Sequence, residues 1–446
     1  METERILQEV LERVTPSPAE RKREAEMAAQ LMKKLRKFKI KPMLVGSLAK
    51  ETDLRGDKDI DIFMVFPQSV TREDLERLGL DYGKRLFKEL KAVYEIDYAE
   101  HPYVKGRYNN YTIEVVPCYS GKTIMCSVDR TPLHTAYIKR ELKKNPKLRA
   151  EIRLLKQFMK GCNVYGAESK IEGFSGYLTE LLGLHHGSFL KVLEASSDWK
   201  FGHVIDHERH WENPEDLKYF FTGSDLIVVD PVDKDRNVAA AVSRQKLAEF
   251  IVASKEFLDS PKVSFFFPSK KAAKSVKELE KALKSRGTRS IALVLKHGYI
   301  NENSLYSQLR RTLKSVVNEI SGEGFSVMKS DFWTDENKLS AIVLEFNVWE
   351  LPNVVQHMGP PIDRDVENQE RFREIYSRFK PYIKGGHWVV DKKRKYTIVD
   401  QLVPKIVRER KGFGKDLRSA RIVVRKDNAV INIDGEDYKL FLDRFI

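Results

Sequence analysis

Apolar and polar positions along the chain predict a mixed α+β protein. Residues 3–14 repeat apolar side chains at helical spacing, and a second helix is expected to start at Ser17-Pro18, where serine suits the N-cap and proline the first helical position. Residues 59–66 alternate between polar and apolar side chains and then become wholly apolar. This pattern is typical of a strand whose start lies at a water-filled cleft and whose end is buried. The same region is expected to hold strands at 42–45, 94–99 and 111–116 and a helix at 71–90.

The rest of the chain follows a different order of elements. Residues 146–200 are expected to be helical, and 225–245 to hold a short strand, a loop and the start of a helix. From residue 291 the order is β-α-β-β-α, with a helix expected at 367–379; ferredoxin-like folds and many RNA-binding modules share this order. A proline and a lysine cluster at 265–274 predict a domain junction. The sequence therefore predicts a multidomain α+β fold with a head at 1–145, a mainly helical middle domain at 146–265, and a ferredoxin-like (RRM-like) body with a basic tail at 266–446.

Composition narrows the class of protein. Of the 446 residues, 41% are hydrophobic and 32% are charged, a balance typical of globular domains. No apolar run approaches the ~20 residues that a membrane-spanning helix needs, and the charged N-terminus has no signal-peptide core. Three cysteines without CxxC spacing predict neither a disulfide framework nor a zinc site. The sequence argues against secretion and membrane insertion and favours a cytoplasmic protein with reduced thiols.

Net charge indicates the kind of partner. The chain has 79 Lys and Arg against 65 Asp and Glu, a formal charge of +14. Such an excess attracts polyanions, that is nucleic acid, nucleotide phosphates or an anionic membrane surface. The densest basic run lies at 405–426. By itself this run also fits a solvated surface.

Candidate chemistry begins with Asp59 and Asp61. In a strand, residues i and i+2 project to the same face, so the two carboxylates lie side by side. Like charges at that distance repel unless a cation lies between them. Divalent metals with oxygen ligands, Mg²⁺ above all, supply such a cation and are usually accompanied by phosphates. Seen alone, the pair also fits a solvated strand end.

Two further features strengthen the metal interpretation. Glu114 lies in the middle of the apolar strand expected at 111–116, and a third carboxylate reaches the same face if that strand pairs beside 59–66. Three carboxylates can hold two metal ions ~4 Å apart, an arrangement suited to phosphoryl transfer. Gly46-Ser47, at the end of the strand before, offers backbone N–H groups and a hydroxyl to phosphate oxygens. The combination predicts metal-dependent nucleotidyl transfer.

The same motifs carry a resemblance to a known family. A Gly-Ser pair, a later Asp-x-Asp and a third carboxylate strand resemble the polymerase-β nucleotidyltransferase superfamily. The chain more specifically resembles the archaeal-type (class I) CCA-adding enzymes, which are tRNA nucleotidyltransferases, densely over residues 1–260 and loosely beyond. The matching stretches are VGSLAKETDLRGDKDIDIFMVFP, YAEHPYVKG, EVVPCY, CSVDRTPLH, RLLKQFMKGCNVYGAE, GFSGYLTELL and DPVDKDRNVAAAVS.

The resemblance implies roles for individual residues. The acidic triad would be Asp59, Asp61 and Glu114, where the family often has glutamate at the first position and usually aspartate at the third. Lys50 stands where the family usually has arginine, so the charge is kept and the bidentate fork is lost. Arg236 would read the base edge, with Asp230 or nearby backbone supporting it. The other residues expected to bind the nucleotide are Ser47, Thr131, His134, Lys156 and Tyr165.

The resemblance also implies an activity and partners. The enzyme would add CMP, CMP and AMP from CTP and ATP to the 3′ end of tRNA without a nucleic-acid template, with Mg²⁺ as cofactor and release of pyrophosphate. The basic run, including Arg418 and Arg421, would grip the acceptor–TΨC arm, and family members suggest a homodimer. Two alternatives remain open: another RNA 3′-nucleotidyltransferase, such as a poly(A)- or oligoadenylate-type polymerase, and a catalytically silent tRNA-binding protein.

Overall fold

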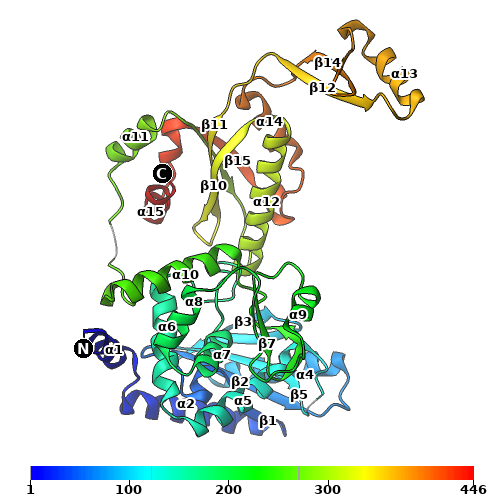
Figure 1. The fold of residues 1–446 in the computed structure, drawn as a ribbon. Helices are drawn as coiled ribbons and strands as arrows, with labels where there is room; N and C mark the ends of the chain where they lie inside the picture. Colours follow the sequence, from blue (N-terminus) through cyan, green and yellow to red (C-terminus); the bar gives the residue numbers. More distant parts are fainter. Residues whose placement is uncertain (1, 122, 270–271) are drawn as a thin grey trace. The chain divides into compact units, whose positions relative to one another are not determined.

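The computed structural model describes residues 2–121, 123–269 and 272–446. The chain divides into two compact units, residues 1–269 and 270–446 (Figure 1). The junction predicted at 265–274 includes residues 270 and 271, which lie outside the described residues. The domain boundaries predicted at 145 and 265 stay predictions.

Two helices open the first unit, as predicted. Helix α1 spans Glu2–Val14 and helix α2 spans Pro18–Arg36. The Ser17 hydroxyl accepts a hydrogen bond from the backbone N–H of Glu20 at 3.2 Å, so serine acts as the N-cap that the sequence indicated. The Glu20 carboxylate accepts from the N–H of Gly56 instead of returning to the cap, which ties α2 to the loop before strand β2.

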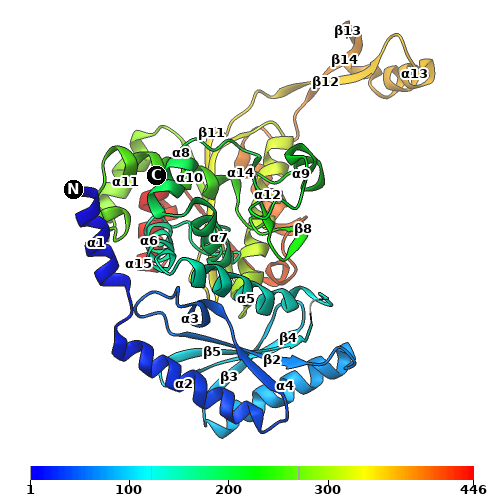
Figure 2. The same ribbon diagram turned by 60° about the horizontal axis from the view of Figure 1, so that its bottom comes forward.

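A five-stranded sheet forms the centre of the head. Its order is β1-β2-β5-β4-β3, and β2 and β5 run parallel. Helices α2 and α4 lie on one face of the sheet and α3 and α5 on the other (Figure 2). The strands are β1 (Lys41–Leu44), β2 (Asp59–Phe66), β3 (Val93–Tyr98), β4 (Pro102–Tyr108) and β5 (Tyr111–Tyr119); the helices are α3 (Gly46–Lys50), α4 (Arg72–Glu89) and α5 (Arg130–Lys144).

Strand β4 was not predicted, and β5 runs past Pro117, where the sequence suggested an end. Strand β4 carries Pro102 and Gly106, two residues that usually interrupt strands. Gly106 is required by packing, since a Cβ there would lie 2.5 Å from the ring of Phe87. The glycine that obscured the strand in the sequence is thus the residue that lets α4 approach it.

The following region is built mainly of helices around one apolar core. Buried side chains of α1, α5, α6, α7, α8 and α10 form a single cluster, so this region and the edge of the head share a core. A small sheet of order β6-β7-β8 completes it. The elements are α6 (Leu148–Gly161), α7 (Gly176–His186), α8 (Phe189–Ser197), α9 (Pro214–Phe220), α10 (Arg244–Asp259), β6 (His203–Ile205), β7 (Leu226–Asp230) and β8 (Asp233–Asn237).

The second unit contains a four-stranded antiparallel sheet of order β10-β11-β9-β15. Alternate residues of β9 and β11 pack under α12 and α14 on one face and under α11 and α15 on the other. Burial on both faces explains the continuous apolar runs of these strands. The elements are α11 (Val276–Ser285), β9 (Arg289–Lys296), α12 (Glu302–Gly322), β10 (Ser326–Thr334), β11 (Leu339–Val348), α14 (Val399–Glu409), β15 (Arg421–Lys426) and α15 (Glu436–Phe445).

An arm is inserted between β11 and α14. It consists of a three-stranded sheet of order β12-β14-β13 with α13 beside it (Figure 1). Its bounds are β12 (Val354–Pro361), α13 (Val366–Ile375), β13 (Tyr382–Lys384) and β14 (His387–Lys393). The helix expected at 367–379 is therefore α13, which ends at Ile375 and packs on β12 rather than on the four-stranded sheet. Within the described ranges, no helix is long and apolar enough to cross a membrane.

Helix α2 carries a buried acid whose ionisation opposes folding. Glu24 is 3% exposed, and its carboxylate oxygens lack hydrogen-bond partners in the described part of the chain. Burial, together with Asp53 and Glu20, raises the pKa of Glu24 to about 7. Folding therefore favours the protonated acid, and stability is lost as the pH rises from the ordinary pKa through the raised one.

We expect Glu24→Gln to raise the free energy of unfolding by about 1–3 kcal/mol at about pH 8 and to have little effect near pH 4, because the amide cannot ionise. Denaturant melts at both pH values measure this difference. Glu26→Gln, an exposed position on the same helix, serves as the control. Equal effects of Glu24→Gln at the two pH values would contradict the assignment.

Candidate active site

The three predicted acids lie on one face of the head sheet. Asp59 and Asp61 are on β2, and the parallel register pairs Asp61 with Glu114 and Asp59 with Thr112 on β5. On the next strand, β4, Lys105 pairs with Glu114. Paired residues of neighbouring strands share a face. Asp61, Glu114 and Lys105 therefore form a row across β2, β5 and β4.

Burial, followed by repulsion between neighbouring carboxylates, disfavours ionisation of Asp61 and Asp59. Burial, Glu114 and Asp59 raise the pKa of Asp61 to about 7, and burial followed by Asp57 raises the pKa of Asp59. The nearby cations Lys50 and Lys105 act in the opposite direction on Asp61. Lys105 Nζ lies 2.9 Å from Glu114 Oε1, so a lysine ammonium now supplies the countercharge.

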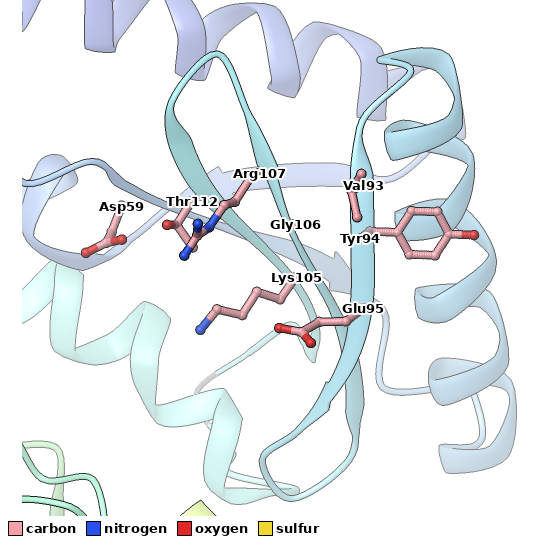
Figure 3. A pocket seen from close by; sticks show the side chains of 8 residues that line it. All are labelled: Asp59, Val93, Tyr94, Glu95, Lys105, Gly106, Arg107 and Thr112. Atoms are coloured by element: carbon pink, nitrogen blue, oxygen red, sulfur yellow. The ribbon is translucent and has the colours of Figure 1, made fainter. Parts of the chain in front are cut away.

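A hollow of about 440 Å³ opens beside Asp59. Figure 3 shows Asp59, Thr112, Arg107 and Lys105 pointing to the same side of the sheet, while Tyr94 points to α4 behind it. The hollow therefore has basic side chains next to the carboxylates.

These acids suit a divalent cation by their chemistry. Neighbouring carboxylates repel one another, so they favour a cation between them, and oxygen ligands favour hard divalent ions. Within the described residues, no three His, Cys, Asp or Glu side chains are grouped closely enough to hold a metal ion together. Asp59, Asp61 and Glu114 thus share a face of the sheet. The Lys105 ammonium contacts Glu114, the third of these acids.

Gly46 brings the end of β1 against this row. Its φ is +72°, and a Cβ there would lie 2.0 Å from Oδ2 of Asp61. The N–H of Val45 donates to the carbonyl of Asp61 at 3.0 Å. Ser47, predicted to bind phosphate, follows in the first turn of α3 and is half-buried. The Gly-Ser pair therefore lies directly beside the acidic strand.

Lys50 and Lys156 both reach one buried carboxylate. Lys50 Nζ lies 2.6 Å from Glu180 Oε2, and Lys156 Nζ lies 3.2 Å from Glu180 Oε1. The Thr52 hydroxyl also donates to Glu180 at 2.5 Å. Lys156 therefore lies in a buried network between the head and α7 and not on the surface.

Asp230 gathers a second set of predicted residues. One of its oxygens lies 2.8 Å from His134 Nε2 and 2.7 Å from an Arg236 amine nitrogen, and the other accepts from the Tyr177 hydroxyl at 3.0 Å. Although burial opposes it, the contacts with His134, the backbone N–H of Val232 and Arg236 lower the pKa of Asp230 to about 2. An ionised carboxylate only accepts, so Nε2 of His134 carries the proton in this contact. The support expected for Arg236 from Asp230 is present.

The remaining predicted residues lie nearby or in the second unit. Thr131 is in the first turn of α5, three residues before His134 and on the same face of the helix. Tyr165 is half-buried, and a Cβ at Gly176 would lie 2.9 Å from its hydroxyl, which places it at the start of α7. Arg418 and Arg421 are exposed in the second unit, Arg421 as the first residue of the edge strand β15.

Three residues that contact the predicted site residues were not predicted from the sequence. Lys105, Tyr177 and Glu180 were not singled out, although all lie within stretches that carried the family resemblance. Tyr177 stacks on His134 with ring centroids 3.9 Å apart. The available signal was a glutamate among apolar residues in GYLTELLGL, which predicts a buried charge that needs a cation.

Comparison with family models covers most of the chain. Residues 26–146 match a model described as a nucleotidyltransferase domain. Residues 150–267 match the second domain of tRNA nucleotidyltransferase, and residues 286–430 match the C-terminal domain of the CCA-adding enzyme.

Two individual CCA-adding enzymes agree with these matches. The CCA-adding enzyme of Methanothermobacter thermautotrophicus is 38% identical, with 91% of this chain and 88% of that protein covered. The CCA-adding enzyme of Methanosarcina mazei is 35% identical, with 98% and 97% covered. Among solved structures, a cytoplasmic RNA terminal U-transferase has a TM-score of 0.48 at 13% identity, covering 60% of this chain and 99% of that one.

The acidic row on a sheet that matches the nucleotidyltransferase domain defines the chain as a nucleotidyltransferase, a class that uses divalent metal ions. Its similarity to relatives along almost their whole length is more specific. The chain belongs to the CCA-adding enzymes and is a tRNA nucleotidyltransferase, which confirms the family that the motifs predicted.

The contact between Gly46 and Asp61 gives a direct test of the acidic row. We expect Gly46→Ala to lower nucleotide incorporation by about 100-fold, because the new methyl group displaces the Asp61 carboxylate. Gly56→Ala is the matched control. Gly56 also has a positive φ, +84°, but a Cβ there meets nothing within 4 Å. Equal loss of activity in both variants would show that backbone strain, and not displacement of Asp61, is responsible.

Proposed function

We propose that this enzyme adds CMP, CMP and then AMP to the 3′ end of tRNA, using CTP and ATP and releasing pyrophosphate. The observation that carries the proposal is the register of β2 and β5, which sets Asp61 opposite Glu114 beside the Gly46-Ser47 turn. The relatives are CCA-adding enzymes over nearly their full length, which favours this product over a poly(A) or oligoadenylate tail.

The acidic row is the proposed site of Mg²⁺. Asp59, Asp61 and Glu114 would hold the metal. Glu114 would give up its ion pair with Lys105 and bind the metal ion instead. Bound divalent ions lower the pKa of the attacking 3′-hydroxyl and neutralise the charge that develops on pyrophosphate. The raised pKa of Asp61 supports the assignment, since the cluster lacks a positive charge that two nearby lysines only partly supply.

The nucleotide is proposed to lie between the head and the helical region. Ser47, Lys50 and Thr131 would bind the triphosphate, and Tyr165 the nucleotide near the start of α7. His134 donates Nε2–H to Asp230, so its other ring nitrogen can donate to a phosphate only when the ring is protonated. Lys156 would add positive charge from its buried position beside Glu180. Arg236, aligned by Asp230, would read the base edge with its remaining donors.

The second unit is proposed to bind the acceptor–TΨC arm of tRNA. Strand order β15-β9-β11-β10, with α12 and α14 on one face, supports the ferredoxin-like interpretation of this body. The exposed Arg418 and Arg421 supply charge for phosphate contacts. Recognition by backbone and shape suits an A-form helix, whose deep groove offers little sequence readout.

We also propose a cytoplasmic homodimer. The arm exposes apolar side chains, including Met358 at 65% and Val366 at 68%, which supports a protein contact there. The mass of the enzyme in solution, measured by light scattering, tests this assembly.

The function is tested by replacing one acid of the row. Asp61→Ala is expected to reduce incorporation of CMP and AMP by about 100-fold or more, while tRNA binding at low salt is retained. The assay offers each of the four nucleoside triphosphates separately to tRNAs ending at successive 3′ positions. Asp74→Ala, on the exposed side of α4, is the control. Long homopolymer products from the native enzyme would favour a poly(A)-type polymerase, and unimpaired incorporation by Asp61→Ala would refute the site.

The tRNA-binding role of the second unit is tested separately. Arg418→Gln combined with Arg421→Gln is expected to weaken tRNA binding and to reduce the salt dependence of log K by about 1–2, because up to two phosphate contacts are lost. Lys277→Gln with Lys281→Gln, on exposed positions of α11, removes the same charge elsewhere. The same affinity and salt slope in both double variants would contradict a specific role for the two arginines.

A further inference from the structure

A buried charged group in the first unit joins three helices. Lys50 comes from α3, Lys156 from α6 and Glu180 from α7, and their exposures are 7%, 2% and 0%. Charges are rarely buried to this extent without a compensating role, since removing them from water costs several kcal/mol per ion. The distances within the group show how that cost is offset.

Most of the hydrogen-bonding capacity of this group is used internally. Glu180 accepts from Thr52 and Lys156 on one oxygen and from Lys50 on the other. Lys156 has three N–H donors and three acceptors within reach: the Thr52 carbonyl at 3.1 Å, the Thr52 hydroxyl at 3.1 Å and Glu180 at 3.2 Å. All three N–H donors of the Lys156 ammonium therefore have an acceptor.

Lys50 differs from Lys156 in this respect. Its ammonium donates to Glu180, and no other acceptor in the described chain receives its remaining two N–H groups. Its charge also lowers the pKa of both Asp61 and His134, so it lies near the acidic row and the Asp230 set at once. Lys50 is thus the member of the group with donors left for a ligand.

The charge balance indicates what kind of ligand this is. Two lysines against one glutamate leave the buried group with one excess positive charge. A phosphate oxygen satisfies both the excess charge and the free donors of Lys50.

We propose that Glu180 is a positioning residue for the nucleoside triphosphate. Thr52 and Lys156 fix its carboxylate, and the carboxylate holds Lys50 with its two free N–H groups directed at the phosphates. Lysine lacks the rigid fork of the arginine usual at this position in the family, and an anchoring carboxylate restores a fixed direction to a flexible ammonium. This inference rests on the proposed nucleotide site.

The experiment measures KM and kcat for CTP and ATP separately. Glu180→Gln keeps the shape of the side chain and removes its charge. We expect KM for both nucleotides to rise by about 10-fold with a much smaller change in kcat, while inhibition by cytidine, which has no phosphate, stays the same. Thr179→Val is the matched control, because Thr179 is a fully buried polar residue on the same helix. Within the described residues its hydroxyl donates to the Ser175 carbonyl at 2.9 Å, with the Met159 sulfur at 3.4 Å.

A double-mutant cycle tests whether Glu180 acts through Lys50. In a Lys50→Met background, Glu180→Gln is expected to leave KM unchanged, because the ammonium that it positions is gone. Full additivity of the two changes, or equal effects on cytidine and CTP, would overturn the inference. Glu180→Asp, which keeps the charge on a shorter arm, is expected to give an intermediate KM.

Loss of one partner of a buried ion pair often destabilises a protein, so a second variant removes one cation together with the anion. Lys156→Met with Glu180→Gln lowers the number of buried charges without adding to the imbalance. It is expected to raise KM at least as much as Glu180→Gln alone, because the positive charge of Lys156 is lost as well. An unchanged KM in this variant would overturn the inference.

These outcomes separate the inference from the proposed site. If Lys50→Met alone leaves KM for CTP and ATP unchanged, Lys50 does not bind the triphosphate and the proposed site is wrong. If Lys50→Met raises KM and Glu180→Gln does not, only the positioning role of Glu180 is refuted.

Discussion

The parallel pairing of β2 with β5 places carboxylates side by side although they repel each other. Asp61 lies opposite Glu114 because the backbone register requires it, and Asp59 is two residues away on the same face. Apolar residues of the same strands, such as Ile62 and Val115, are fully buried and hold that register against the repulsion. Burial of the apolar side chains in each strand thus offsets the repulsion between the carboxylates in the same strands. Lys105, Lys50 and the Gly46 turn are arranged around this constraint.

The helical region, which carries several of the residues proposed to bind the nucleotide, shares an apolar core with the head. Residues of α1 and α5 pack in the same apolar cluster as α6, α7 and α10. Polar contacts cross that boundary at several points: Lys50 with Glu180, His134 with Asp230, and Arg130 with Asp233 at 2.7 Å. The groups proposed to bind phosphate and those proposed to read the base are therefore held in fixed relation by packing and by buried ion pairs.

Local patterns predicted the fold where a segment's environment is simple. The alternation in 59–66 predicted β2 with its observed bounds, because one end is solvated and the other buried. The cap at Ser17 was equally local. Strand β4 was missed because Gly106 serves a contact with Phe87 on another element, and the insertion of the arm between β11 and α14 leaves no mark in the β-α-β-β-α pattern. Spacing along the strands predicted that the three acids share a face, which the register of β2 and β5 bears out. The contacts of Glu180 and Lys105 depend on which helix or strand lies next to them, and this cannot be predicted from spacing.

Asp230 has a consequence for fidelity. A single carboxylate oxygen accepts from both the histidine assigned to the phosphates and the arginine assigned to the base. A nucleobase that draws the Arg236 guanidinium away from Asp230 would leave the negative charge of that carboxylate to interact with the His134 imidazole. The imidazole would then bind a proton more readily. In the proposed site, nucleobase recognition by Arg236 and phosphate binding by His134 would be coupled through one carboxylate oxygen of Asp230, so a mismatched base would weaken phosphate binding.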